Sequence, residues 1–178
     1  GIISLNNTSI YNNHATIKGG GIYSGNTDQL PNLIFSETEK CNIYGNYAPA
    51  GGTDIWFENA SEQMDIPLDT FTVATPSDYY AHGNITFDIT NHKIEPIVGN
   101  IYVNPTGSND NSGTTPTSPL KNIYYGLLSA FANSSNPAVI YLSDGLYSLN
   151  NGDHFPIGGK DYVSFSGSSG DGTILNGD

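Results

Sequence analysis

The chain has 178 residues, of which 37% are hydrophobic and 12% are charged, with 17 acidic side chains against five lysines. Its net charge of −12 argues against nucleic acid, which needs clustered basic side chains, and against docking on anionic lipid. No apolar run approaches the roughly 20 residues that cross a bilayer, so the sequence predicts no membrane insertion.

The first part of the chain contains a repeat of 33 residues. The stretch Thr8–Ala15, followed by Gly19–Tyr23, recurs as Cys41–Ala48, followed by Gly51–Trp56. The short apolar runs in each copy are bounded by Asn and Gly, which predicts strands. A repeat of this size cannot bury its apolar face alone and must stack on its neighbours. The sequence therefore predicts the terminal turns of a β-helix over residues 1–60, with alternation placing four isoleucines inside: Ile10, Ile22, Ile43 and Ile55.

The pattern changes between residues 61 and 99. Ile66–Leu68, Phe71–Val73 and Ile85–Ile89 are each bounded by turn-forming residues, which predicts separate strands. Ile85, Phe87 and Ile89 alternate with polar residues, as in a half-buried strand. Because the stretch is too apolar for disorder, we expect a β-rich connector or cap over residues 61–99.

A new pattern covers residues 100–178. A strand at Ile101–Val103 and a polar loop at Asn104–Pro119 precede Leu120–Ala132, where apolar residues at helical spacing predict one short helix. Four strands separated by Gly- and Asp-rich turns follow it: Val139–Leu142, Gly145–Tyr147, Tyr162–Phe165 and Thr173–Leu175.

This last region resembles the opening of a known family. Ile101–Thr114 carries a strand and then Pro-x-Gly-Ser-x-Asp-x-x-Gly-Thr, Ser118–Ile123 carries Pro-hydrophobic-Lys-x-Ile, and Val139–Tyr147 carries Ile-Tyr-Leu-x-x-Gly-x-Tyr. Thr173–Gly177 is similar to a closing Thr-Ile-Leu-Asp-Gly, with Asn in place of Asp. These motifs resemble the first turns, of the DUF1565 type, of right-handed parallel β-helix proteins in the pectate-lyase-like superfamily. The resemblance implies a capping region and first β-helix turns over residues 100–178.

The predicted fold class is thus all-β, a right-handed parallel β-helix (solenoid) with a β-rich connector and one short capping helix. Residues 1–60 are typical of the last turns of a β-helix, and residues 100–178 are typical of the capped start of one. The chain is therefore expected to join two consecutive solenoids of a longer protein. Gly1 opens directly into patterned sequence, which we interpret as a processed or excised end. A composition rich in Asn, Gly, Ser and Thr predicts an exported, extracellular or cell-surface protein of a prokaryote.

Few residues are candidates for chemistry. Lyases of this superfamily use an Arg or Lys base beside Ca²⁺ on the middle turns of the β-helix. The resemblance covers only first and late turns, so it implies no such site in this chain. Hydrolases of the superfamily pair carboxylates, but Asp54 with Glu58, and Glu37 with Glu39, are interpreted as solvated turn residues. We therefore predict no catalytic residue, no enzyme activity and no cofactor.

One metal site is predicted from the polar loop. Asn109, Asp110 and Asn111, with Thr114, offer the oxygen ligands that Ca²⁺ prefers. The alternative interpretation is that these residues form Asx-turns, in which a side chain bonds to nearby backbone.

The predicted function is a non-enzymatic structural or surface module, such as a fibre, a stalk or an adhesin-like protein. We expect it to act through self-association into a filament or tandem array, or through surface interaction. The alternative is the non-catalytic portion of a carbohydrate-active, polysaccharide lyase-like enzyme. In that case the 12 tyrosines and Trp56 supply stacking surfaces for sugars.

Overall fold

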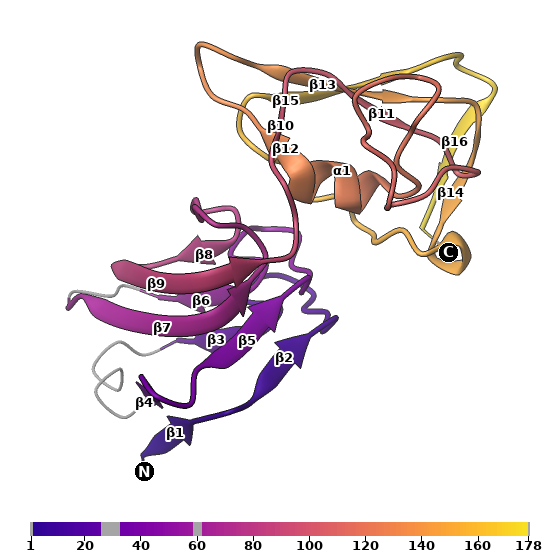
Figure 1. The fold of residues 1–178 in the computed structure, drawn as a ribbon. Helices are drawn as coiled ribbons and strands as arrows, with labels where there is room; N and C mark the ends of the chain where they lie inside the picture. Colours follow the sequence, from indigo (N-terminus) through magenta and orange to yellow (C-terminus); the bar gives the residue numbers. More distant parts are fainter. Residues whose placement is uncertain (1, 26–32, 59–61, 178) are drawn as a thin grey trace. The chain divides into compact units, whose positions relative to one another are not determined.

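The computed structural model describes residues 2–25, 33–58 and 62–177, and its chain forms two compact units, residues 1–94 and 95–178. Every pairing between named strands in these ranges is parallel (Figure 1). The prediction of an all-β chain with parallel sheets is confirmed. No helix within the described ranges has the length and apolar character that a membrane span requires.

The first unit contains three parallel sheets, with strand orders β1–β4, β2–β5–β7–β9 and β3–β6–β8. Their nine strands are β1 (Ile3–Leu5), β2 (Ser9–Tyr11), β3 (Ile22–Ser24), β4 (Leu33–Phe35), β5 (Cys41–Tyr44), β6 (Ile55–Phe57), β7 (Met64–Phe71), β8 (Ala81–His82) and β9 (Ile85–His92).

The sequence repeat is also the spatial register of this unit. Ile10 pairs with Ile43, and Ile22 pairs with Ile55, so residues 33 apart lie side by side. Between β5 and β7 the separation falls to 27 residues at Cys41, and between β7 and β9 it falls to 21. Successive layers therefore use progressively less chain.

Alternate side chains of the strands form the core of the first unit. Ile43 and Ile55 are 0% exposed, while Ile10 and Ile22, on the outermost strands, are only partly covered. Gly20 permits close stacking of the layers, because a Cβ there would lie 2.4 Å from the carbonyl oxygen of Thr53. Other buried side chains of this core include Phe57, Ile66, Leu68, Phe71, Val73 and Tyr80.

Most of the region expected to be a β-rich connector or cap belongs to the first unit. Residues 64–92 form β7, β8 and β9, which extend two sheets of the first unit. β7 is one strand rather than two, because the pairing with β5 passes over Asp69 in a bulge that lets the strand continue. The boundary between the two units lies after Ile94.

The second unit contains sheets ordered β10–β12, β11–β13–β15 and β14–β16, one α-helix, and one 3-10 helix at Leu149–Asn151. Its other elements are β10 (Ile97–Val98), β11 (Ile101–Val103), α1 (Ile123–Ser129), β12 (Ala130–Phe131), β13 (Ala138–Leu142), β14 (Gly145–Ser148), β15 (Val163–Gly167) and β16 (Thr173–Asn176).

The helix α1 is shorter than the predicted Leu120–Ala132. Leu120 is held in a parallel bridge with Val103, and Asn122 is extended, so the helix cannot begin before Ile123. At its other end the chain turns extended at Ala130 and enters β12. Apolar periodicity detected the helix, but strand pairing on both sides set its ends.

Candidate functional site

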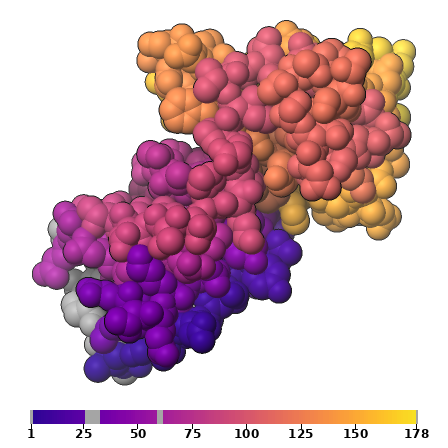
Figure 2. Space-filling view, viewed as in Figure 1, coloured from indigo at the N-terminus to yellow at the C-terminus, as the bar shows by residue number. Residues whose placement is uncertain are grey.

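Two outer sheet edges, one in each unit, are the best-developed candidates for an interaction surface. In the first unit the edge consists of β1, β2 and β3, which we call the first edge; its indigo residues lie along one margin of that unit (Figure 2). In the second unit it consists of β15 and β16, which we call the last edge. Among the described residues, no strand pairs with the outer side of either edge.

The last edge exposes side chains that point toward a core. Phe165 pairs with Ile140, and Leu175 pairs with Tyr147, and both of these partners are 0% exposed. Phe165 itself is 41% exposed and Leu175 is 44% exposed. Neither strand contains a charged residue. Since natural proteins protect free strand edges with charges, prolines or covering loops, this edge is suited to pairing.

The opposite edge of the sheet that contains β15, formed by β11, is covered. The backbone of Tyr102 in β11 donates to the carbonyl of Gly113 and accepts from the N–H of Leu120. The loop that contains the predicted calcium ligands therefore closes the free side of β11. The edge at β11 thus differs from the last edge, because a segment of the same unit already pairs with it.

The predicted calcium ligands bond within that loop. Asn109 Oδ1 accepts the backbone N–H groups of Lys121 and Asn122, at 3.0 and 3.2 Å, and Asn111 donates to the carbonyl of Pro119 at 2.7 Å. The Asp110 carboxylate accepts from Ser108 at 3.4 Å. In the described ranges, no three His, Cys, Asp or Glu side chains are grouped to hold a metal ion. The calcium site stays a prediction, and the Asn109 and Asn111 side chains bond to backbone 8 to 13 residues further along the chain rather than within a local Asx-turn.

A second group of side chains surrounds Trp56 on the outer face of β3, β6 and β8. The Glu58 carboxylate accepts from Trp56 Nε1 at 2.8 Å and pairs with Lys18 at 3.1 Å. The Lys18 ammonium and the Trp56 N–H hold the pKa of Glu58 below its usual value. The His82 ring stacks on Trp56 with 3.9 Å between ring centroids, and Lys18 Nζ lies 4.2 Å from the Trp56 ring centroid.

These contacts cover both faces of the Trp56 ring. His82 comes from β8 and Lys18 precedes β3, on opposite sides of β6 in the sheet. A sugar that stacked on Trp56 would have to displace one of them. Tyr44 is similar, with the Tyr11 ring at 5.2 Å on one side and Lys93 Nζ at 4.7 Å from its centroid.

The predicted carboxylate pair Asp54 and Glu58 is not brought together. Glu58 follows β6 and bonds to the outward-facing Trp56, whereas Asp54 lies in the corner before β6 and is 0% exposed. Asp54 accepts from Thr72 Oγ1 at 2.6 Å and from the backbone and side-chain N–H groups of Asn46 at 3.1 and 2.9 Å. Burial raises the pKa of Asp54 to about 7 despite these bonds. The interpretation of Asp54 as a solvated turn residue is therefore wrong.

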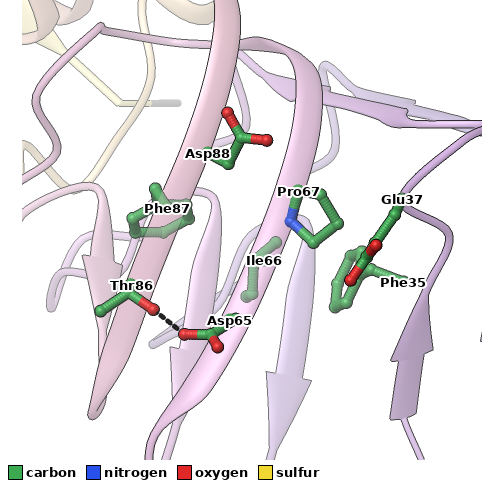
Figure 3. A pocket seen from close by; sticks show the side chains of 8 residues that line it. All are labelled: Phe35, Glu37, Asp65, Ile66, Pro67, Thr86, Phe87 and Asp88. Carbon is green, nitrogen blue, oxygen red and sulfur yellow. Dashed lines mark hydrogen bonds between the residues drawn. The ribbon is translucent and has the colours of Figure 1, made fainter.

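The other pair, Glu37 and Glu39, is exposed as expected, and Glu37 borders a groove of about 450 Å³ (Figure 3). Two more carboxylates line that groove, but each already has a partner: Thr86 donates to Asp65, and Lys40 binds Asp88 at 2.7 Å. No feature of the groove points to a ligand. Its full lining is Phe35, Glu37, Asp65, Ile66, Pro67, Thr86, Phe87 and Asp88.

The fold and these contacts define a class of strand-rich protein with parallel, stacked sheets. Residues 105–176 match the model of a protein family known as DUF1565, described as a protein of unknown function. That family is often associated with parallel β-helix proteins. No curated protein and no solved structure matches the chain. The match confirms the DUF1565 resemblance of the last region, and the wider superfamily stays a prediction.

Proposed function

We propose that this chain is part of a right-handed parallel β-helix and serves as a non-enzymatic structural module at a prokaryotic cell surface, such as a fibre, stalk or adhesin-like protein. Parallel strands joined by crossovers are right-handed in about 98% of cases, which supports the handedness. The module acts through self-association or surface interaction, without a cofactor of its own.

The observation that carries the proposal is the last edge. Phe165 and Leu175 occupy positions whose partners in the next layer are fully buried, yet more than a third of each side chain is exposed. Covering them with a second copy would remove apolar surface from water at about 25 cal/mol per Å². Unpaired backbone groups of β15 and β16 would gain hydrogen bonds in the same step.

The alternative function, the non-catalytic part of a carbohydrate-active enzyme, gains less support. The ring faces of Trp56 and Tyr44 are already occupied by neighbouring side chains. Sugar binding in proteins uses open aromatic faces, so these two rings are poor platforms. Incubation with uronate polysaccharides, followed by the absorbance of unsaturated products, tests the parent protein for lyase activity.

The experiment that tests self-association is a concentration series followed by light scattering after size-exclusion chromatography. We expect the unmodified chain to associate and Phe165→Lys to weaken association at least tenfold, because an inward-pointing charge blocks an edge. Val98→Lys is the matched control, since Val98 is 65% exposed and belongs to another sheet. Circular dichroism establishes that each variant is folded, and Leu175→Lys replaces Phe165→Lys if the latter is not.

A monomeric chain at the highest concentration would contradict self-association at this edge. So would equal association of the Phe165→Lys and Val98→Lys variants. The same variants in the full polypeptide in which residues 1–178 occur distinguish an edge that is available there from one that other segments cover.

A further inference from the structure

The first edge carries no acidic residue. Residues 2–25 contain Lys18 and His14 but none of the 17 Asp and Glu side chains of the chain. In a protein with a net charge of −12, such a stretch is free of the repulsion that would keep another segment of the chain away. Tyr11 and Ile17 are 49% and 62% exposed there.

The contacts between β2 and the next strand, β5, show which side-chain groups hold neighbouring layers together. The Tyr11 ring stacks on the ring of Tyr44, and His14 stacks on Tyr47 with 4.7 Å between centroids. Asn46 Oδ1 accepts the backbone and side-chain N–H groups of Asn13, at 3.0 and 2.9 Å. Each contact joins residues 33 apart, so the layers recognise one another by like chemistry at a fixed offset.

Three groups on the outer side of β2 have no bond to another described strand: the backbone N–H groups of Ser9 and Tyr11, and the side-chain oxygen of Asn13. In a parallel ladder, alternate residues bond to opposite neighbours, and the carbonyl of Thr8 already accepts from Asn42 in β5. The N–H groups of Ser9 and Tyr11 therefore point away from β5. Asn13 Oδ1 has no donor there, whereas Asn46 Oδ1, at the same position of the next layer, has two.

We infer that the first edge binds a further repeat of the same 33-residue pattern, parallel and in register, with an aromatic ring over Tyr11 and an asparagine beside Asn13. The inference rests on the stacked-layer architecture of the proposed function but not on self-association at the last edge. It names the chemistry of the partner: a short strand, an Asn at the turn and an aromatic residue at the outer face.

A second copy docked by this same edge does not satisfy these requirements. Two identical edges that meet are related by a two-fold axis, which makes their strands antiparallel. Tyr11 and Asn13 would then not face their own equivalents at the offset seen between β2 and β5. The partner is therefore a repeat that continues the stack in the same direction.

The test adds such a repeat to the whole chain. Residues 1–33 are duplicated ahead of residue 1, in a Phe165→Lys background that removes association at the last edge. We expect the urea midpoint of the first unit, followed by the fluorescence of Trp56, to rise measurably. We also expect the amide hydrogens of Ser9 and Tyr11 to exchange at least tenfold more slowly, because they become bonded to the added strand.

The matched control carries Tyr11→Ser and Asn13→Ser in the added copy only, so the chain length is the same. It should lose most of the gain in exchange protection and midpoint. If the added repeat leaves Ser9 and Tyr11 exchanging as before, or if the control protects them equally, the inference is overturned. Association of the original chain is measured separately, so either proposal can fail while the other stands.

Discussion

Both units stack like side chains between paired strands, as Tyr102 and Tyr141 do in the second, but the second unit adds contacts of another kind. In the first unit, side chains of the same kind stack at a 33-residue offset, as Asn13 does with Asn46. In the second unit, unlike groups from distant segments meet at the helix α1. Asp153 accepts the N–H of Ile123 at 2.8 Å, and Lys160 donates to the carbonyl of Ala130 at 2.7 Å. A repeat therefore reveals the first kind of contact, and nothing local reveals the second.

The difference extends to charge. The first unit buries an acid, Asp54, without a salt bridge among the described residues, and burial raises its pKa to about 7. The second unit holds a base, Lys160, whose pKa is lowered to about 7 by burial. Asp153 lies at the start of α1 and Lys160 at its end, where the helix dipole favours a negative and a positive charge respectively. Burial also raises the pKa of Asp153 in the second unit, so both units should lose stability as pH rises on the acid side. Only the second unit holds a buried base, and its contribution should rise with pH between about 7 and 10.5.

The largest expected effect concerns Asp54. Its folded pKa lies above its unfolded value, so the folded state keeps a proton that the unfolded state releases between about pH 4 and 7. The free energy of unfolding of the first unit therefore falls as pH rises across that window, by about 1.4 kcal/mol per unit at most. Asp54→Asn should remove this slope. Urea titrations at several pH values, followed by the single tryptophan, measure it.

Asp65→Asn serves as the control for Asp54. Asp65 is exposed on β7, and the hydroxyl of Thr86 holds the pKa of its carboxyl below the usual value. Its contribution has the opposite sign and is lost as pH falls, so the variant should keep the decline between pH 4 and 7. A flat profile in the unmodified chain would show that Asp54 is not the buried acid inferred here.

The sequence predicted much of the first unit because its contacts repeat. The 33-residue offset predicts that Ile10 lies opposite Ile43 and Ile22 opposite Ile55, as the strand pairing confirms. It could not predict the burial of Asp54, since the equivalent position of the preceding repeat is Gly21, which has no side chain to compare. An acidic residue after a Gly-Gly-Thr turn is ordinarily solvated, but Asn46 and, from the next layer, Thr72 enclose Asp54.

In the second unit, motifs located the strands but not the groups that close the helix. Lys160 lies in a Gly-Gly-Lys-Asp turn, where a lysine is ordinarily exposed, and its partners Leu127 and Ala130 are about 30 residues earlier. The predicted ligand Asn109 also has a role that the motif did not indicate, accepting backbone N–H groups just before α1. Such contacts join unlike residues at unrelated spacings, so no periodicity reports them.

A smaller effect is expected for Lys160→Met. Because the folded pKa of Lys160 is depressed, the unfolded state holds an extra proton between about pH 7 and 10.5, and the stability of the second unit rises with pH there. Two carbonyl bonds and the helix end favour the charged form, so the rise is at most about 1.4 kcal/mol per pH unit. Amide exchange in β13 between pH 7 and 9.5 reports it, and the Met variant should lose the rise. An unchanged slope would contradict the assignment.

The smallest expected effect concerns Lys18, at the surface of the first unit. Lys18→Met removes the ion pair with Glu58 and the cation over Trp56, groups that are about one-third exposed. Surface ion pairs contribute little to stability, so the urea midpoint should fall only slightly, with a change in tryptophan emission as the ring loses a covering group. Lys121→Met removes the same charge from the second unit and should leave that emission unchanged. If Lys18→Met also leaves the emission unchanged, Lys18 does not cover Trp56, and that ring face becomes available to a sugar.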